Sequence, residues 1–266
     1  MDPDYLFRIR TVKAAPFRTL VEAIKDILTD ANIEFDSQGM KIMAMDGTHT
    51  ILVHLRLNAD RFDEYHCPQK HVLGINMINF FKLIKTISNN ESVVLFMDKK
   101  DTTKLGIEIL NGEKQRVTRF SLKLIEIDIN PIKIPPVEFS SIITMPSTDF
   151  QKIIRDMHTL GELVEIQSAA QELSFRCSGD YAEQETIFSK GQDGITQTKA
   201  ANEIVQGNFM LKYLVLFTKC TSLCSDISLY LKNDYPIIVE YNVAGLGEIK
   251  LALAPAHKKS SSEGSS

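Results

Sequence analysis

The strongest constraint on the fold of this chain is an internal repeat. Residues 17–47 read FRTLVEAIKDILTDANIEFDSQGMKIMAMDG, and residues 150–180 read FQKIIRDMHTLGELVEIQSAAQELSFRCSGD. Both segments place apolar residues at helical spacing and then two short strands about a polar turn. A second pair aligns without gaps, MINFFKLIK at 77–85 with LKYLVLFTK at 211–219, and each precedes a β-rich run. Few letters match, so the order and period of the elements predict the repeat.

The repeat predicts an α+β chain of two similar domains, each with two helices and many strands. The 266 residues suffice for two domains, and the 44% hydrophobic content suffices for their cores. The segment SLKLIEIDINPIKIPPVEFSS separates the copies, and its prolines are typical of an extended connector. We predict an N-terminal domain at 1–120, a connector at 121–141, a C-terminal domain at 142–255 and a disordered, serine-rich tail at 256–266.

The composition argues against several classes of protein. No run reaches the roughly eighteen apolar residues of a membrane span, and the acids near the start argue against a signal peptide. The four cysteines are scattered through a long chain, which indicates buried thiols in a reducing compartment. The 30 basic and 34 acidic residues give a net charge of −4, so any basic patch must be confined to one face.

Basic residues nevertheless recur in pairs on each of the four expected helices. The members of a pair are three or seven positions apart in the sequence, and both spacings return to nearly the same helix face. The pairs are Arg18 with Lys25, Lys82 with Lys85, Lys152 with Arg155, and Lys212 with Lys219. Solvation of an outer face explains any one pair, but four pairs in an acidic chain favour one positive surface. Because no aromatic residues interleave, we expect this surface to contact the duplex backbone rather than stacked bases.

Several segments resemble the proliferating cell nuclear antigen family of eukaryotic sliding clamps. They are VEAIKDILTDA, GMKIMAMDGTHTILVHL, FDEYHCP, LKLIEIDINPIKIP, MPSTDFQKIIRDM, LKYLVLFTK, DYPIIVEY and LALAP. The resemblance runs collinearly over residues 5–255, and the segments are specific together although none suffices singly. It implies a head-to-tail homotrimeric ring with sheets outside and helices around duplex DNA. It also implies that the basic pairs face the lumen of that ring.

The resemblance further implies a nuclear polymerase processivity factor without a cofactor, or one at the site of viral DNA replication. Its partners would be double-stranded DNA, further copies of itself, DNA polymerase, a clamp loader and other clients, and no membrane. Clients of the family insert a short hydrophobic peptide under the connector. By motif position, the residues of this pocket are Met45, His49, Leu52, Asp128, Ile132, Ile134, Pro236, Ala252, Ala254 and Pro255.

Two segments are candidates for the subunit boundary. KQRVTRFSLK carries Arg116 and Arg119, and YAEQETIFSK carries Glu183 and Glu185. The corresponding strands of the family pair between subunits, which consumes edges that would otherwise invite aggregation. The sequence alone leaves open that both strands lie inside one sheet.

The chain departs from the family at three places. Ala252 stands where the family often has an aromatic residue, which implies a shallower pocket or different clients. Ala170 lies at or near the position of the ubiquitin-acceptor lysine, and Lys258 and Lys259 replace an acidic tail. These departures indicate a divergent member of viral or protist origin.

We expect neither a metal site nor catalysis. His66, Cys67 and His71 lie close together, but a zinc site needs four well-spaced ligands. Asp46 and His49 fit a strand-end turn, and no nucleophile elbow, phosphate-cradling glycine loop or paired-carboxylate motif accompanies them. The alternatives are a subunit of a heterotrimeric checkpoint-type clamp, a monomeric DNA-binding processivity protein, and an enzyme with an unrecognised site. The basic pairs favour the DNA-contacting alternatives, and assembly state separates these.

Overall fold

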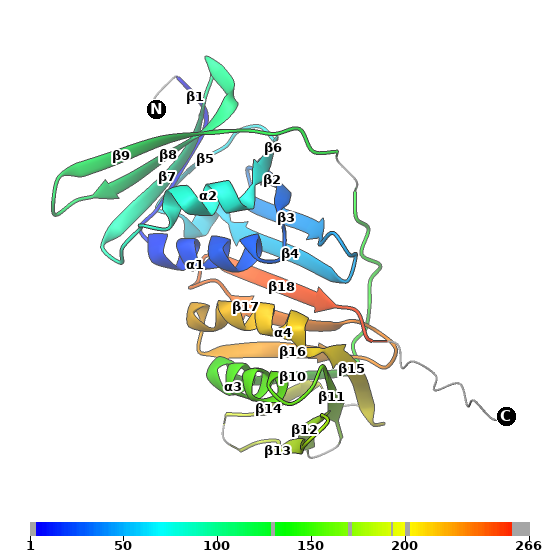
Figure 1. Ribbon diagram of the computed structural model, residues 1–266. Helices are drawn as coiled ribbons and strands as arrows, with labels where there is room; N and C mark the ends of the chain where they lie inside the picture. Colours follow the sequence, from blue (N-terminus) through cyan, green and yellow to red (C-terminus); the bar gives the residue numbers. More distant parts are fainter. Residues whose placement is uncertain (1–3, 129–130, 170–171, 193, 200–202, 257–266) are drawn as a thin grey trace.

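The computed structural model describes residues 4–128, 131–169, 172–192, 194–199 and 203–256 of the chain. Within these residues, two copies of one α+β unit follow each other, with the helices in front of the sheets in Figure 1. Ala170 and the predicted tail beyond Ala256 lie outside the described residues.

The first copy consists of nine strands, two α-helices and one 3-10 helix within the described residues. Its elements are β1 (Tyr5–Thr11), α1 (Ala14–Lys25), β2 (Asp30–Asp36), β3 (Gly39–Met45), β4 (Ile51–Asn58), η1 (Ala59–Arg61), β5 (Glu64–His66), β6 (His71–Asn76), α2 (Met77–Ile84), β7 (Glu91–Asp98), β8 (Asp101–Asn111) and β9 (Arg116–Lys123).

The second copy repeats this order of strands and α-helices, so β10 corresponds to β1, α3 to α1 and β18 to β9. Its elements are β10 (Ser141–Pro146), α3 (Ser147–His158), β11 (Leu163–Ser168), β12 (Glu172–Ser178), β13 (Glu183–Ser189), β14 (Thr196–Lys199), β15 (Val205–Met210), α4 (Leu211–Phe217), η2 (Thr218–Leu223), β16 (Asp226–Leu231), β17 (Ile237–Asn242) and β18 (Gly247–Leu253). The predicted repeat is confirmed.

The strands form three sheets, and one of them spans both copies. The orders are β5-β1-β7-β8-β9, β14-β10-β16-β17-β18-β4-β3-β2-β6, and β13-β12-β11-β15. All the strand pairs are antiparallel, as expected for strands joined largely by hairpins. The middle sheet is continuous because β18 of the second copy pairs with β4 of the first.

This pairing of β18 with β4 is the internal joint of the chain. Its register places Gly247 opposite Leu57 and Leu253 opposite Ile51. A Cβ atom on Gly247 would lie 2.0 Å from the carbonyl oxygen of Arg56, so the close approach of the strands requires glycine there. The joint is thus built into the sequence.

Each helix packs on the sheets through one apolar face. In α1 the buried positions Phe17, Leu20 and Ile24 recur every three or four residues, and α3 repeats the pattern. The side chain of Asn76 caps α2 by accepting the N–H of Asn79 at 2.9 Å. Contacts of α1 with α2 and η2, and of α3 with α4 and η2, join the helices into one layer.

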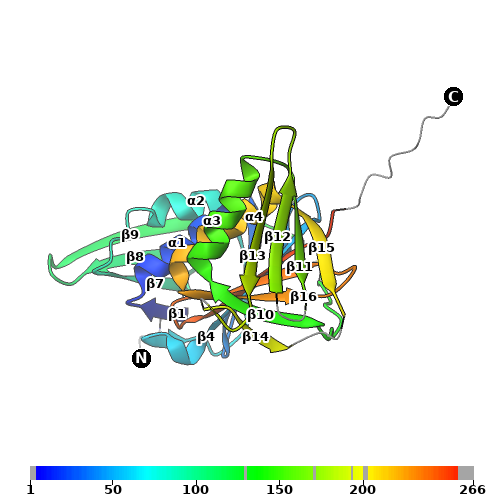
Figure 2. The same ribbon diagram turned by 90° about the horizontal axis from the view of Figure 1, so that it is seen from below.

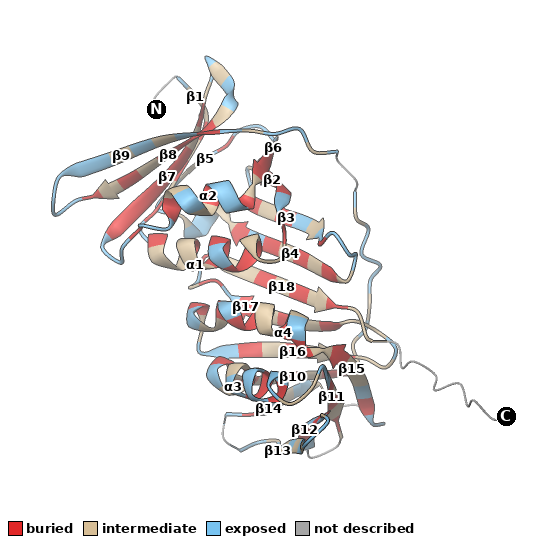
Figure 3. Ribbon diagram, in the orientation of Figure 1, coloured by how far each residue is buried: buried red, intermediate tan, exposed pale blue. Residues whose placement is uncertain are grey.

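Two of the strands that end a sheet in the described chain are the counterparts of the internal joint, since β9 corresponds to β18 and β13 to β4. β9 ends the five-stranded sheet and β13 ends the four-stranded sheet. Much of β9 is drawn as exposed in Figure 3, and exposed residues alternate with partly buried ones along β13. Both edges therefore offer free backbone groups for pairing with another strand.

The two copies are connected by a long segment on the outside of the molecule (Figure 1), and Figure 2 shows the same chain from below. The predicted connector began at Ser121, but residues 121–123 belong to β9, because Leu122 is buried and pairs with Leu105 of β8. The N–H of Ile125 then donates to the carbonyl of Gly74 at 2.9 Å. Between Ile125 and Ser141, where β10 begins, the described residues contain no helix and no strand.

Candidate DNA-facing helix layer, partner pocket and strand edges

Every basic residue predicted to face DNA lies on the helix layer, within or directly after α1–α4. Arg18 and Lys25 are half-buried, and the remaining side chains are exposed. The exposed members are Lys82, Lys85, Lys152, Arg155, Lys212 and Lys219. One layer therefore carries accessible cations from both copies, and their contact with DNA stays a prediction.

The two half-buried cations are engaged within the chain. The guanidinium of Arg18 donates to the carbonyl of Ile87, just beyond α2. Lys25 forms an ion pair with Asp26 at 2.7 Å, and its ammonium lies 4.9 Å from the ring centroid of Phe81. These contacts hold α1 against α2 and make both cations less available to a ligand.

Asp26, the C-cap of α1, connects the two copies. Its Oδ2 accepts a hydrogen bond from the ammonium of Lys219 in η2, and its Oδ1 accepts one from Lys25. Burial raises the pKa of Asp26, but the hydrogen bonds and charges of Lys219 and Lys25 outweigh burial and lower the pKa overall. The carboxylate is therefore ionised at neutral pH and binds both cations.

The other cations of the layer are less constrained. Lys152 pairs with Asp156 at 2.8 Å, but both side chains are exposed, so water screens the pair. For the remaining cations, no carboxylate in the described part of the chain lies within ion-pair distance. These are Lys82, Lys85, Arg155 and Lys212.

A pocket of about 680 Å³ lies on the other face of β2 and β3, beside the connector. It is on the face opposite the side chains that β3 buries in the core. Met45, His49, Asp128 and Ile132, which the sequence predicted for the partner pocket, all line it. Residues far apart in the chain are thus brought together as predicted.

Asp46 organises the turn that positions His49. Its carboxylate accepts the N–H groups of Thr50 and Ile51, each at 2.7 Å, as well as the N–H and hydroxyl of Thr48. His49 has a φ of 56°, in the left-handed region. Burial raises the pKa of Asp46, but these hydrogen bonds lower it overall. Asp46 and His49 therefore form the strand-end turn that the sequence predicted.

The other predicted pocket residues surround this pocket without lining it. Leu52 on β4 stands opposite both Met45 on β3 and Ala252 on β18. Pro255 lines a separate hollow of about 610 Å³, because β4 and β18 run between the two depressions. The remaining residues outside the pocket lining are the exposed Ile134 and the half-buried Pro236 and Ala254.

Sequence reasoning missed several residues of the lining. Met43 and Val72 line the pocket and are 39% and 36% exposed, which is unusual for large apolar side chains. Met43 could have been found, because it shares a strand face with Met45. Val72 comes from β6, and the pairing of β6 with β2 has no local signal in the sequence.

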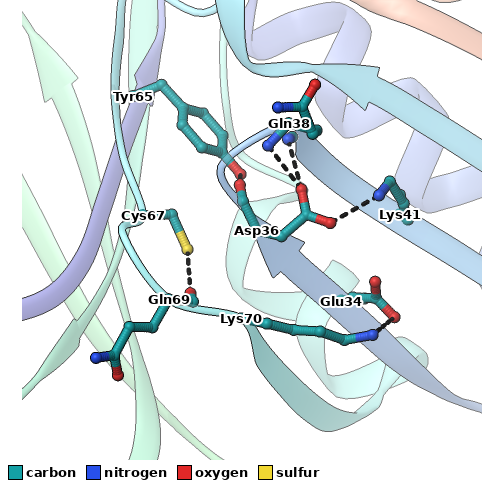
Figure 4. A network of polar contacts seen from close by, with 9 residues as sticks. Glu34, Asp36, Gln38, Lys41, Tyr65, Cys67, Gln69 and Lys70 are labelled. Carbon is teal, nitrogen blue, oxygen red and sulfur yellow. Dashed lines mark hydrogen bonds and ion pairs between the residues drawn. The ribbon is translucent and has the colours of Figure 1, made fainter.

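One end of the pocket is charged. Glu34, Lys41 and Lys70 line it, and Figure 4 shows their pairs. The ammonium of Lys70 lies 2.8 Å from a carboxylate oxygen of Glu34, and that of Lys41 lies 2.7 Å from a carboxylate oxygen of Asp36. The hydroxyl of Tyr65 donates to the backbone carbonyl of Asp36 at 2.8 Å. An occupant would therefore meet apolar side chains at the centre of the pocket and charges at one end.

The residues predicted for the subunit boundary lie on β9 and β13, and each of these strands has a free edge. The alternative that both strands lie inside one sheet is wrong, because β9 and β13 belong to different sheets. The guanidinium of Arg116 lies 3.1 Å from a carboxylate oxygen of the buried Glu91, and that of Arg119 lies 2.8 Å from a carboxylate oxygen of Glu108. The acidic residues also have partners within the chain, Ser178 for Glu183 and Arg176 for Glu185.

Cys67 belongs to the one histidine- and cysteine-rich segment that the sequence analysis considered for a metal site. The thiol of Cys67 donates to the carbonyl of Gln69 at 3.1 Å, and burial raises its pKa to about 11. No group of three or more His, Cys, Asp and Glu side chains is arranged there for a metal ion. The helices of the described segments are also too short or too polar to cross a membrane.

A doubled α+β unit that presents a layer of basic helices is the architecture of the DNA-clamp fold class. The family models "Proliferating cell nuclear antigen, N-terminal domain" and "Proliferating cell nuclear antigen, C-terminal domain" match residues 6–131 and 133–256. The chain belongs to the proliferating cell nuclear antigen family, which confirms the resemblance seen in the sequence.

A viral protein is similar over nearly the whole chain. It is the "Probable DNA polymerase sliding clamp 1" of Paramecium bursaria Chlorella virus 1. The two are 36% identical over 259 residues, which cover 96% of this chain and 98% of the viral protein. The similarity supports the prediction of a divergent family member.

Proposed function

We propose that three copies of this chain close into a ring around duplex DNA and act as a sliding clamp that tethers DNA polymerase. The observation that carries this proposal is the internal joint. β18 pairs with β4, whereas their counterparts in the other copy, β9 and β13, have free edges. Pairing β9 of one subunit with β13 of the next repeats the internal joint between chains. The number of subunits comes from the family.

The side chains on the free edges support this pairing. Transferring the register of β18 and β4 to their counterparts places Arg119 opposite Glu185 and Val117 opposite Ile187. The first pair has opposite charges. Val117 and Ile187 are 45% and 50% exposed in the single chain, and mutual contact would cover both.

A closed ring is retained on DNA by its topology, so it needs no strong affinity. The exposed cations of the helix layer would contact phosphates weakly and often through water. Such contacts are interchangeable along the duplex and independent of sequence, because every nucleotide carries the same charge. Weak contacts inside a closed ring therefore permit sliding without release.

We further propose that the pocket beside the connector binds short hydrophobic segments of the polymerase, the clamp loader and other clients. Its exposed methionines offer an adaptable apolar surface, and the adjacent connector offers backbone groups. This work would take place where DNA is replicated, in the nucleus or at a viral replication site. Apart from the start of the connector, the limits of the two domains and the connector predicted from the sequence also remain proposals.

Solution mass measured by light scattering over a range of concentrations tests the assembly. A single species near three times the 30.0 kDa of one chain is expected. That species should also be retained on closed circular DNA and lost when the circle is cut, because only a ring depends on DNA ends. A stable monomer at every concentration would overturn the homotrimer and favour a heterotrimeric clamp subunit or a monomeric processivity protein.

A further inference from the structure

We infer that Asp26 determines which cations of the helix layer reach DNA, because it holds Lys25 and Lys219 and leaves Lys85, the counterpart of Lys219, unpaired in the described structure. Asp26 would thus be a positioning residue that makes the cations around the lumen alternate between bound and free. The inference rests on the proposed ring, and it concerns a carboxylate that itself touches no DNA.

The first observation is the complete use of the Asp26 carboxylate. One oxygen accepts from Lys25 and the other from Lys219, which belong to different copies of the repeat. The side chain of Asp26 is 24% exposed and that of Lys219 is 40% exposed, so the pair is partly shielded from water. A phosphate that recruited Lys219 would have to displace this partner and approach a carboxylate of like charge.

The second observation is the repeat itself. The gapless alignment of α2 with α4 places Lys85 at the position of Lys219. The alignment of α1 with α3 places Thr159 at the position of Asp26, and both residues are the C-caps of their helices. The hydroxyl of Thr159 donates to the carbonyl of Asp156 at 2.7 Å and carries no charge. The carboxylate of the internal joint therefore has no equivalent at the joint between subunits.

Asp156, whose carbonyl accepts from Thr159, does not replace Asp26. The carboxylate of Asp156 is already paired with Lys152 on the same helix. At the proposed subunit joint, Lys85 would therefore face an uncharged helix cap. Around the ring, cation sites neutralised by Asp26 would alternate with free Lys85 sites, so the lumen would have threefold rather than sixfold charge symmetry.

The test measures affinity for a labelled short linear duplex, which a ring can enter and leave over the DNA ends, as a function of salt. Each phosphate contact contributes about 0.9 to the slope of log affinity against log salt concentration. In the wild-type protein, Lys85→Ala should lower this slope more than Lys219→Ala does. Asp26→Asn should steepen the slope by about 0.9 for each released cation that reaches a phosphate, and Lys219→Ala made in that background should then cost as much as Lys85→Ala.

The matched control is Glu22→Gln. Glu22 is exposed on the same helix and its replacement removes the same charge, but it has no ion pair in the described structure. It should leave the effect of Lys219→Ala unchanged, whereas Asp26→Glu should retain the wild-type behaviour. The reciprocal variant Thr159→Asp should make the slope shallower by about 0.9 for each Lys85 contact that is lost, and it should make Lys85→Ala nearly silent.

The outcomes separate this inference from the proposed function. If the wild-type protein is not a trimer or is not held by circular DNA, the ring itself is overturned. If the ring is present but Lys219→Ala has the same effect with and without Asp26, the inference alone is overturned. If Asp26→Asn disrupts the trimer, the Thr159→Asp variant decides, and an unchanged salt slope there contradicts the inference.

Discussion

The two copies of the repeat share a fold but not a surface. The outer face of β2 and β3 carries Met43 and Met45 in the partner pocket, whereas the equivalent hollow on β11 and β12 has a volume of about 650 Å³ and charged walls. Its lining includes Glu165, Arg176 and Glu185. The strand register places Arg176 in the position of Met43. The backbone has been repeated, while the exposed methionines at these positions belong to one copy.

The connector accentuates this difference. After β9, the N–H of Ile125 donates to the carbonyl of Gly74, and the chain then runs along the partner pocket. After β18, the N–H of Ala256 donates to the carbonyl of Asn208 at 2.8 Å, which is the equivalent bond. Asn208 lines the charged hollow of the second copy. The same backbone contact thus starts two chain segments at two chemically different depressions.

Charge reversal on β9 tests whether the proposed subunit joint resembles the internal joint. We expect Arg119→Glu to convert the trimer to monomers, because it places an acid opposite Glu185. Light scattering measures the loss of mass, and adding Glu185→Arg should restore the trimer. Arg116 is better left intact, since it neutralises the buried Glu91 within its own domain.

The control for this prediction reverses a charge at the internal joint. Arg56→Glu places an acid opposite Glu248 in the β4–β18 pair, but both strands belong to one chain. We expect the trimeric mass to persist. A trimer that survives Arg119→Glu at micromolar concentration would contradict the assignment of β9 to the subunit boundary.

The partner pocket can be given the residues that line the equivalent hollow of the second copy. Met43→Arg with Met45→Ser installs the residues that the second copy has at these positions. We expect affinity for a labelled polymerase peptide to fall about tenfold or more, since each lost apolar anchor costs about 1–3 kcal/mol. Fluorescence anisotropy measures this loss, and Ser178→Met on the second copy serves as the control that leaves the pocket unchanged. Equal binding by both variants would place the peptide elsewhere.

The Asp46 turn predicts a smaller effect on stability. Asp46→Ala removes the acceptor of several backbone N–H groups, so the free energy of unfolding should fall by about 1–3 kcal/mol in chemical denaturation. Asp180, at the end of the equivalent segment in the second copy, is exposed. Asp180→Ala should change the free energy by less than about 0.5 kcal/mol. Similar losses for both variants would refute a special role for Asp46.

Acid should affect the two copies unequally, and this is the smallest effect we predict. Burial raises the pKa values of Asp36, Asp46 and Glu91 in the first copy, but hydrogen bonds lower them overall. A lowered folded-state pKa stabilises the protein above the unfolded value of about 4, and this stability is lost as pH falls through the folded value. In the second copy, the pair of Lys152 with Asp156 is exposed and contributes little.

Hydrogen exchange between pH 7 and pH 3 measures this difference. Amides of β2 and β3 should lose protection at a higher pH than those of β11 and β12. Simultaneous loss in both copies would show that the chain responds to acid as one cooperative unit.

The sequence predicted those features whose signals are local. The repeat and the helices follow from periodicity, and the structure has them, although Arg18 and Lys25 are half-buried and not fully outward. The pocket was only partly predicted. Val72 lies on β6, and the pairing of β6 with β2 has no local signal in the sequence. The contact of Asp26 with Lys219 was not foreseen, since an acid beside Lys25 looks like any other exposed helix residue.

The internal joint has a mechanical consequence for the proposed ring. Within each chain, β18 and β4 are bonded along their length, and the ammonium of Lys13 also reaches across to the carbonyl of Ala244 at 2.8 Å. Between chains, only strand edges would carry tension. The ring would therefore consist of stiff chains joined at weaker boundaries. A force that opens it would separate neighbouring chains before it deformed either of them.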